Sequence, residues 1–437
     1  MTWLVFLGSW LGVRITLLNV SLILGITIAV CIGLLARRNR QQGRETSNAA
    51  ASRSASGSWN LWLVGSLGSI AVLWLAVNSY LAVAQSYSLW DAIAIWSVKG
   101  YGIAQEGSVF AGSEWGAHGL AYPLNVPILV SLFTLAGGDP LPASKLIFPL
   151  YFASLLVGVY GFARTWGMRR EVACLAVLYV ASIPELYEGS MTGYTNAPMT
   201  VCLVLGGLTV LEGAQASSMR KLLTGGALLG VASWTRVEGA LYAGALLVSG
   251  LIALAFFERP RSKWLWALLP LVVIVGPWLV FYRLYGAESS QAIDALSSAV
   301  QAFISGQWHL GALRLILQEA IRSMVDVKSW GWVWPLSGIL ALLLYPRASR
   351  SERAGFLAAA AMCGSAASVT IVLFYFGSFG IELRNWLATT FRRELLPSPI
   401  LLFAGILPLL ASSFRGATAG LERGKRKPSE SERQPAP

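Results

Sequence analysis

Long runs of uncharged, apolar residues recur along almost the whole chain, and this recurrence restricts the fold more than any other feature. A helix needs about 20 such residues to cross a hydrocarbon layer ~30 Å thick. Hydrophobic residues make up 55% of the 437 positions and charged residues only 12%, so a single soluble core could not bury the apolar surface. The sequence therefore predicts an all-α integral membrane protein.

We expect about eleven transmembrane helices, with amphipathic helices in the loops between them. The expected spans lie near residues 15–36, 61–84, 146–163, 172–184, 197–211, 222–235, 239–257, 264–282, 329–346, 354–380 and 395–414. The first of these has no small-residue cleavage site after it and is expected to remain as an anchor. The apolar run 124–138 is expected to be re-entrant or interfacial, because a span there would invert every later basic loop.

Basic residues predict the orientation of these helices, because Lys and Arg in short loops stay on the cytoplasmic side. Six segments hold 22 of the 33 Lys and Arg residues, namely 37–58, 164–171, 213–221, 258–263, 347–353 and the tail from Arg415. With these segments on one side, the long loops 85–145, 283–328 and 381–394 lie on the extracytoplasmic side. The net charge of +12 therefore reflects topology and contact with anionic lipid headgroups, and argues against nucleic-acid binding.

The charge pattern divides the chain into three parts. An N-terminal anchor and basic linker occupy residues 1–58, a polytopic core occupies 59–414, and a basic cytoplasmic tail occupies 415–437. The linker and the tail are expected to be disordered because they are polar and charged. The four cysteines fall inside expected spans, which favours neither a disulfide framework nor a zinc site; they are Cys31, Cys174, Cys202 and Cys363.

Acidic and aromatic residues gather in the expected extracytoplasmic loops. In the first loop, Asp91 lies within the apolar stretch SLWDAIAIW. Positive residues on this side run against the topological bias and are therefore candidates for binding an anion, above all a phosphate; they include Arg236, Arg384, Arg392 and Arg393. Alternatively, these arginines reach lipid phosphates or pair with the acids near them, which are Glu238, Glu382 and Glu394.

Five motifs follow one another on this side of the membrane. They are Trp90-Asp91 with Trp96, His118-x-x-x-Tyr122-Pro123, Gly-Tyr-Thr-Asn-Ala-Pro at 193–198, Trp-Thr-Arg-Val-Glu-Gly at 234–239, and Arg-Arg-Glu-Leu-Leu-Pro at 392–397. In this order they resemble the GT-C-type polytopic glycosyltransferases, among them bacterial relatives of the protein O-mannosyltransferases and of the lipid A aminoarabinose transferase. The resemblance covers about residues 59–412 and implies a GT-C-like fold in a cell membrane, expected to be a bacterial inner membrane.

The resemblance also implies a reaction. A sugar moves with inversion from a polyprenyl-phosphate donor to an extracytoplasmic acceptor, which is a glycolipid, a polysaccharide or a protein. Asp91 matches the general base that takes the acceptor proton. The donor phosphate, whose charge rises as the glycosidic bond breaks, is expected at Arg236, Arg392, Arg393, Lys99 and Arg384. The substrate and the groove are expected at Trp96, Trp115, His118, Tyr122, Tyr194, Asn196 and Glu238.

Two positions depart from the family's pattern. Asn196 stands where the family often has an acid, which removes a possible metal ligand or second carboxylate. Arg236 stands where the family has a Lys, and it keeps the positive charge. A divalent metal stays open, because the remaining candidate ligands have no diagnostic spacing; they are Asp91, Glu106, Glu114, His118 and Glu188.

Three alternatives stay open at this point. Ser88-x-x-Asp91 fits a capping box, in which Asp91 closes the start of a helix instead of acting as a base. A transporter or flippase for a lipid-linked substrate is a second alternative, although it would place charges within spans and these lie at span ends. A non-catalytic membrane scaffold, the third, predicts that changing Asp91 leaves the function intact.

Overall fold

The computed structural model of the chain describes residues 1–30, 58–87, 89–115, 118–137, 143–257, 262–286, 301–302, 304–379 and 382–425. Within these ranges the backbone forms helices and turns and no strand, which confirms the all-α class. Cys31, most of the basic linker and the tail beyond residue 425 lie outside the described residues. The tail expected to be disordered begins as a helix, because α20 (Pro397–Lys425) continues through residues such as Ala, Leu, Glu and Arg that propagate a helix readily.

Helices at the expected spans form most of the bundle. Besides α20, they are α3 (Ser58–Ala84), α7 (Ile147–Thr165), α8 (Arg170–Ala181), α10 (Asn196–Gln215), α11 (Met219–Ser233), α12 (Gly239–Phe257), α13 (Leu268–Tyr285), α17 (Val333–Leu344) and α18 (Arg350–Gly377). A short apolar helix, Leu17–Val30, lies within the first expected span.

Length and composition allow six helices in the described part of the chain to cross a membrane. The number is seven if α8 and α9 (Pro184–Thr192), which meet at a bend of 64°, form one span. The count of eleven therefore stays a prediction. One expected span, 329–346, is interrupted at Gly331, whose φ of +59° is a conformation that glycine adopts without steric cost. The break separates α16 (Val327–Trp330) from α17.

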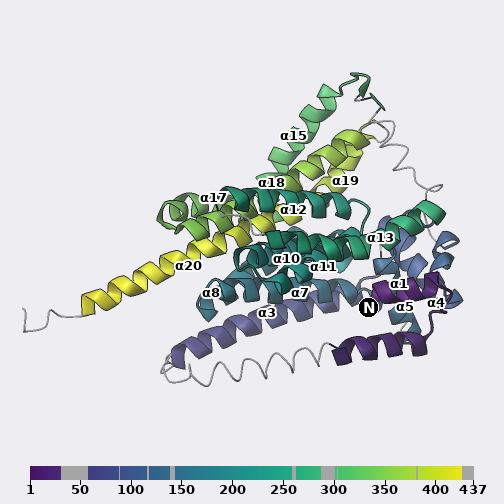
Figure 1. Cartoon of the computed structure of the whole chain (residues 1–437), viewed down its shortest axis with the longest axis horizontal. Helices are drawn as coiled ribbons and strands as arrows, with labels where there is room; N and C mark the ends of the chain where they lie inside the picture. The colour runs from purple at the N-terminus through teal and green to yellow at the C-terminus, as the bar shows by residue number, and fades with distance from the viewer. Residues whose placement is uncertain are drawn as a thin grey trace, which may run out of the picture.

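The centre of the bundle is formed by α10 and α11, with α3 on one side and α17 and α18 on the other (Figure 1). Close packing of α10 on α11 depends on small residues, as is common between membrane helices. At Gly206, an added Cβ would lie 2.9 Å from a side-chain carbon of Leu229 and 3.0 Å from its backbone nitrogen. By contrast, α3 leaves Trp62, Val72 and Leu73 exposed, as expected for a helix that faces lipid.

Short elements gather at one end of the bundle, where Figure 1 shows α1, α4 and α5 together. They comprise α1 (Thr2–Trp10), a π-helix (Ala92–Ser97), α4 (Val98–Glu106), a 3-10 turn (Val109–Ser113) and α5 (Asn125–Leu135). The 11 residues of α5 extend about 16 Å at 1.5 Å per residue. This helix is too short to cross the hydrocarbon layer, as expected for the run 124–138.

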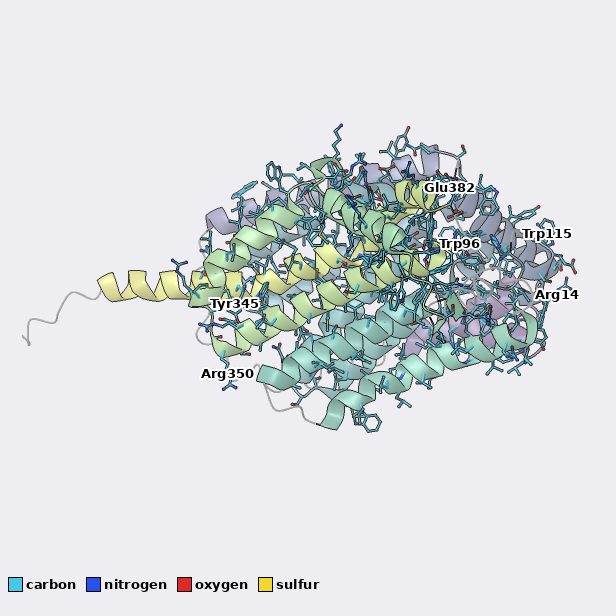
Figure 2. The ribbon with its side chains drawn as sticks, turned by 90° about the horizontal axis from the view of Figure 1, so that it is seen from above. Arg14, Trp96, Trp115, Tyr345, Arg350 and Glu382 are labelled. Carbon is cyan, nitrogen blue, oxygen red and sulfur yellow. The ribbon has the colours of Figure 1, made fainter. Side chains whose placement is uncertain are left out.

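The two ends of the bundle differ as the charge pattern predicts. Figure 2 places Tyr345 and Arg350, from the basic segment around the 3-10 turn Tyr345–Arg347, at one end, and Trp96 and Glu382 toward the other. The remaining elements are a 3-10 helix (Ser262–Ala267), α15 (Leu310–Met324), which projects from the bundle in Figure 1, and α19 (Leu383–Leu395). The carboxyl end of α19 returns into the bundle just before α20 and carries the Arg-Arg-Glu motif.

Candidate functional site

Side chains from distant parts of the chain meet around Arg236, in the turn between α11 and α12. Its Nη1 donates to Oγ1 of Thr195 at 3.2 Å and to Oδ1 of Asn196 at 2.9 Å. Its Nη2 donates to Oε1 of Glu394 at 3.1 Å, and its Nε donates to Glu238. All three guanidinium nitrogens are therefore engaged, and the side chain is only 12% exposed.

The charge of Arg236 is held by these partners. Burial by itself lowers the pKa of the guanidinium, but the carboxylates of Glu238 and Glu394 outweigh this effect and raise it. Because the donors of Arg236 are already used by its neighbours, its contacts in this structure are those of the pairing alternative. Its role in binding a phosphate stays a prediction. Glu238, which we expected to contact substrate, is likewise occupied by Arg236.

Two further contacts fix Glu394 in this cluster. Nδ2 of Asn196, at the start of α10, donates to Oε1 of Glu394 at 2.7 Å. The hydroxyl of Tyr242 on α12 donates to the backbone carbonyl of Glu394 at 3.1 Å. The end of α19 is therefore joined to the starts of both α10 and α12.

Arg393, one residue earlier on α19, has a different environment. Its guanidinium carbon lies 3.7 Å from the centre of the Tyr194 ring, and its Nη2 donates to Oγ1 of Thr390 at 3.1 Å. Its Nε and Nη1 are buried and have no hydrogen-bond partner among the described residues. Buried polar groups are normally satisfied, and a guanidinium N–H forms a strong, charge-assisted hydrogen bond with an oxyanion. Arg393 therefore has the free donors that Arg236 lacks.

The other two arginines of α19 point elsewhere. Nη1 of Arg392 pairs with Oδ2 of Asp326 at 3.0 Å and donates to Oγ of Ser329 at 2.7 Å. Arg384 is exposed and lies eight residues before Arg392, about 12 Å along the helix. Of the three, Arg393 alone has buried donors without a partner in the described part of the chain.

Residues of the first loop meet around Tyr122. The ring of Trp96 lies edge-on to Tyr122 at 5.5 Å, and the His118 ring lies 5.4 Å from it. Nζ of Lys99 lies 5.9 Å from the centre of the same ring. Lys99 is fully buried, and its amine has no hydrogen-bond partner among the described residues. Because burial disfavours the charged form, the pKa of Lys99 is lowered to about 8.

The first loop and the Arg236 cluster share one electrostatic neighbourhood. The pKa of Tyr122 is raised to about 12, mainly by burial and further by the carboxylates of Glu238, Asp91 and Glu394, with Arg236 acting in the opposite direction. Asp91 and Arg236 therefore both act electrostatically on the Tyr122 hydroxyl, in opposite directions.

Asp91 immediately precedes the π-helix, and its side chain makes no capping hydrogen bond to that helix. Ser88, the other half of the expected capping box, lies outside the described residues. The π-helix itself was not expected from the sequence. Such helices are rare and are frequent at functional sites, and this one leads from Asp91 through Trp96 toward Lys99.

Two expected features are not part of this cluster. Trp115 donates through Nε1 to Oε1 of Glu106 at 2.6 Å and packs against Tyr101. Figure 2 shows it at the outer edge of the molecule, away from Trp96. In the described ranges, no group of three or more His, Cys, Asp or Glu residues could hold a metal ion.

Glu394 is the residue that sequence reasoning most undervalued, because we expected it only as a partner for nearby arginines. The sequence signal that could have identified it is that Glu394 directly precedes a long apolar span, where a carboxylate needs a buried partner. Asp326 and Thr195 were not expected at all.

Comparisons with known proteins agree with the resemblance found in the sequence. The family model described as dolichyl-phosphate-mannose-protein mannosyltransferase matches residues 122–281, a stretch that contains Tyr122, Asn196 and Arg236 and ends before α19. No curated protein sequence matches this chain.

Among solved structures, ArnT from Cupriavidus metallidurans bound to undecaprenyl phosphate matches with a TM-score of 0.52 and 15% identity. The match covers 85% of this chain and 64% of ArnT, so the chain spans slightly less than two thirds of its relative. The apo oligosaccharyltransferase of Archaeoglobus fulgidus matches with a TM-score of 0.41 and 12% identity, over 81% of this chain and 52% of the other. The likeness to ArnT confirms the expected GT-C-like, multi-pass membrane fold.

Proposed function

We propose that this chain, which has the fold of the GT-C glycosyltransferases, transfers a sugar from a polyprenyl-phosphate donor to an extracytoplasmic acceptor. The observation that carries the proposal is that two buried guanidinium nitrogens of Arg393, Nε and Nη1, lack a hydrogen-bond partner among the described residues, beside Tyr194. A buried cation with free donors fits a bound oxyanion. ArnT, whose fold this chain shares, was solved with undecaprenyl phosphate.

The phosphate of the donor contacts Arg393 through Nε or Nη1, the two guanidinium nitrogens that lack a partner in the described residues. Lys99 supplies a second positive charge from the first loop, since its amine also lacks a partner in the described part of the chain. Both cations stabilise the phosphate more as its negative charge increases in the transition state. Arg236 stays with Glu238 and Glu394 and positions the site without touching the donor.

Asp91 acts as the general base. The acceptor hydroxyl or amine attacks the anomeric carbon from the face opposite the phosphate, so the configuration inverts. Its proton passes to the Asp91 carboxylate, the bond from the anomeric carbon to the phosphate oxygen breaks, and polyprenyl phosphate leaves with the electron pair. The Asp91 carboxylate makes no capping hydrogen bond to the π-helix that follows it, so it is not needed to close that helix and can serve the acceptor.

The aromatic residues beside these groups suit a sugar. Trp96 and His118 contact Tyr122 from two sides, and aromatic faces pack against the apolar faces of sugar rings. Tyr194 fixes the plane of the Arg393 guanidinium by stacking. The acceptor class is a glycolipid, a polysaccharide or a protein, and the membrane is a bacterial inner membrane with the site on its outer side.

Purified protein in liposomes tests the proposal. Donors consisting of different labelled sugars on undecaprenyl phosphate are supplied with a mixture of cell-envelope acceptors, and released undecaprenyl phosphate is measured with labelled product. We expect release that depends on the protein and is abolished by Arg393→Gln. Movement of intact donor across the membrane without cleavage would instead indicate a flippase. Absence of both binding and cleavage for every donor would contradict the proposal.

A further inference from the structure

Three successive side chains at the end of α19 contact three different parts of the protein. Arg392 contacts Asp326 and Ser329 of the α16 region. Arg393 stacks on Tyr194, ahead of α10. Glu394 accepts hydrogen bonds from Asn196 and from Arg236. The rotational position of this one helical turn is thus set by contacts in three directions.

Asp326 is placed to hold the first of these contacts. Its Oδ1 accepts from the backbone N–H of Lys328 at 3.1 Å, and its Oδ2 accepts from Oγ of Ser329 at 2.9 Å. The same Oδ2 lies 3.0 Å from Nη1 of Arg392. Both carboxylate oxygens are used, so Asp326 caps α16 and binds α19 with one side chain.

The α16 end of this contact is anchored. Trp330, the last residue of α16, is buried, and its Nε1 donates to Oγ of Ser323 on α15 at 3.3 Å. The backbone N–H of Trp330 also donates to the carbonyl of Asp326 at 3.1 Å. A carboxylate fixed in this way offers Arg392 a rigid partner, unlike the flexible ion pairs of an ordinary surface.

Helix geometry links this contact to Arg393. Successive residues of an α-helix point about 100° apart, and Arg392 and Arg393 accordingly contact different partners, Asp326 and Tyr194. When Arg392 is held by Asp326, a roll of α19 that would carry Arg393 away from Tyr194 is blocked. If the contact between Arg392 and Asp326 is lost, the last turn of α19 loses the restraint closest to Arg393 and can rotate about the helix axis.

We propose that Asp326, together with Ser329, is a positioning residue that holds Arg392 and thereby keeps Arg393 over Tyr194 with two donors free for an anion. This inference rests on the proposed function for the identity of the anion, which is the phosphate of the donor. Asp326 acts through Arg392 and does not touch the donor. Arg392 is consequently a structural contact, and its positive charge is already matched by a carboxylate.

If Arg392 instead bound the donor phosphate directly, the variant Asp326→Asn would have the opposite effect on donor affinity. Asp326→Asn keeps a side chain that caps helices well but removes the negative charge. If Arg392 bound the phosphate, removing a competing carboxylate would leave donor affinity unchanged or improve it. If Asp326 positions α19, the same change weakens donor affinity.

The test is the Kd for undecaprenyl phosphate, with kcat and KM for the donor, for Asp326→Asn, Arg392→Gln and the double variant in lipid nanodiscs. We expect each single change to raise Kd and KM about 10-fold, and the double change to cost no more than either, because both remove one coupled contact. Asp326→Glu, which keeps the charge, should recover most of the affinity. Glu319→Gln is the matched control, since it removes the carboxylate that pairs with the exposed Arg322 on α15. Unchanged or tighter binding by Asp326→Asn would overturn the proposal.

A second measurement does not depend on turnover. Spin labels on cysteines placed at the exposed positions Lys328 and Ala388, in a background without native cysteines, report the distance from α16 to α19. Asp326→Asn should broaden this distance distribution, and Glu319→Gln should not. If the wild type bound no undecaprenyl phosphate, the proposed function would fail while this measurement still decided the positioning role; an unchanged distribution in Asp326→Asn would overturn it.

Discussion

Asn196 donates a hydrogen bond of 2.7 Å to Glu394, although 198 positions separate the two residues in the chain. The same carboxamide accepts a hydrogen bond of 2.9 Å from Arg236 through Oδ1. An amide can do both because it carries a donor and an acceptor, whereas an ionised carboxylate can only accept. The amide at position 196 thus bridges Arg236 and the carboxylate of Glu394.

Asn196→Asp should therefore destabilise the protein. The new carboxylate would lose the hydrogen bond to Glu394 and face it as a like charge, with a cost of about 1–3 kcal/mol. Thermal unfolding in detergent measures this as a lower Tm. Adding Glu394→Gln, which supplies a donor and removes the repulsion, should restore part of the loss. An Asn196→Asp variant as stable as the wild type would contradict this account of the cluster.

Arg236→Gln should reduce stability and activity together. The change leaves the buried carboxylates of Glu238 and Glu394 without their cation, and breaking a buried ion pair from one side costs about 3–5 kcal/mol. Chemical or thermal unfolding in nanodiscs measures the loss of stability, and the transfer assay measures the loss of activity. A variant that lost donor binding but kept full stability would show that Arg236 binds the donor directly.

Arg393→Gln should weaken donor binding while leaving the stability of the fold almost unchanged. Two of its guanidinium nitrogens have no partner in the described residues, so the folded protein loses little when the group is removed. The donor loses its charge-assisted contact with Arg393, and we expect its Kd to rise about 100-fold, which corresponds to about 3 kcal/mol. Arg322→Gln, at an arginine that is 77% exposed on α15, is the control and should bind donor normally. Equal binding by the two variants would remove Arg393 from the phosphate site.

Activity should fall as pH rises through about 8, because Lys99 has its pKa lowered to about that value and only the protonated amine attracts phosphate. The limb should be visible in kcat/KM, which reports the free enzyme. Lys99→Arg, which stays protonated, should move it to higher pH. The stability of the folded protein should instead increase as the pH rises. Between pH 8 and 10.5 the unfolded chain binds more protons at this residue, so the free energy of unfolding rises with pH. If the pH dependence of kcat/KM were identical in the wild type and in Lys99→Arg, Lys99 would be excluded as the cause of the fall in activity.

Most helices could be predicted from the sequence, because a membrane-spanning segment is encoded locally by an uninterrupted apolar run. Positive residues in short loops likewise encode the two ends of the bundle. The break at Gly331 could not be predicted, since a glycine within an apolar run gives no sign of its φ. The π-helix after Asp91 has no local signature that distinguishes it from an α-helix.

The sequence pointed to several residues of the candidate site but not to their pairings. Arg236 stood out as a positive charge against the topological bias, and Asp91 and Tyr122 lie in the motifs of the resemblance. That Arg236 bonds Glu394, 158 residues away, depends on packing that no local pattern records. The same holds for Arg392 and Arg393, which look alike in sequence and differ because adjacent helical residues face different neighbours.

The most direct test of the central claim compares wild type with Asp91→Asn in transfer of labelled sugar from undecaprenyl phosphate, with donor affinity measured in parallel. The amide keeps the size of the side chain and removes the base. We predict a loss of turnover of about 10²–10⁴-fold with an unchanged Kd for the donor. Wild-type turnover in Asp91→Asn would contradict the account and would leave Asp91 as a structural residue at the start of its helix.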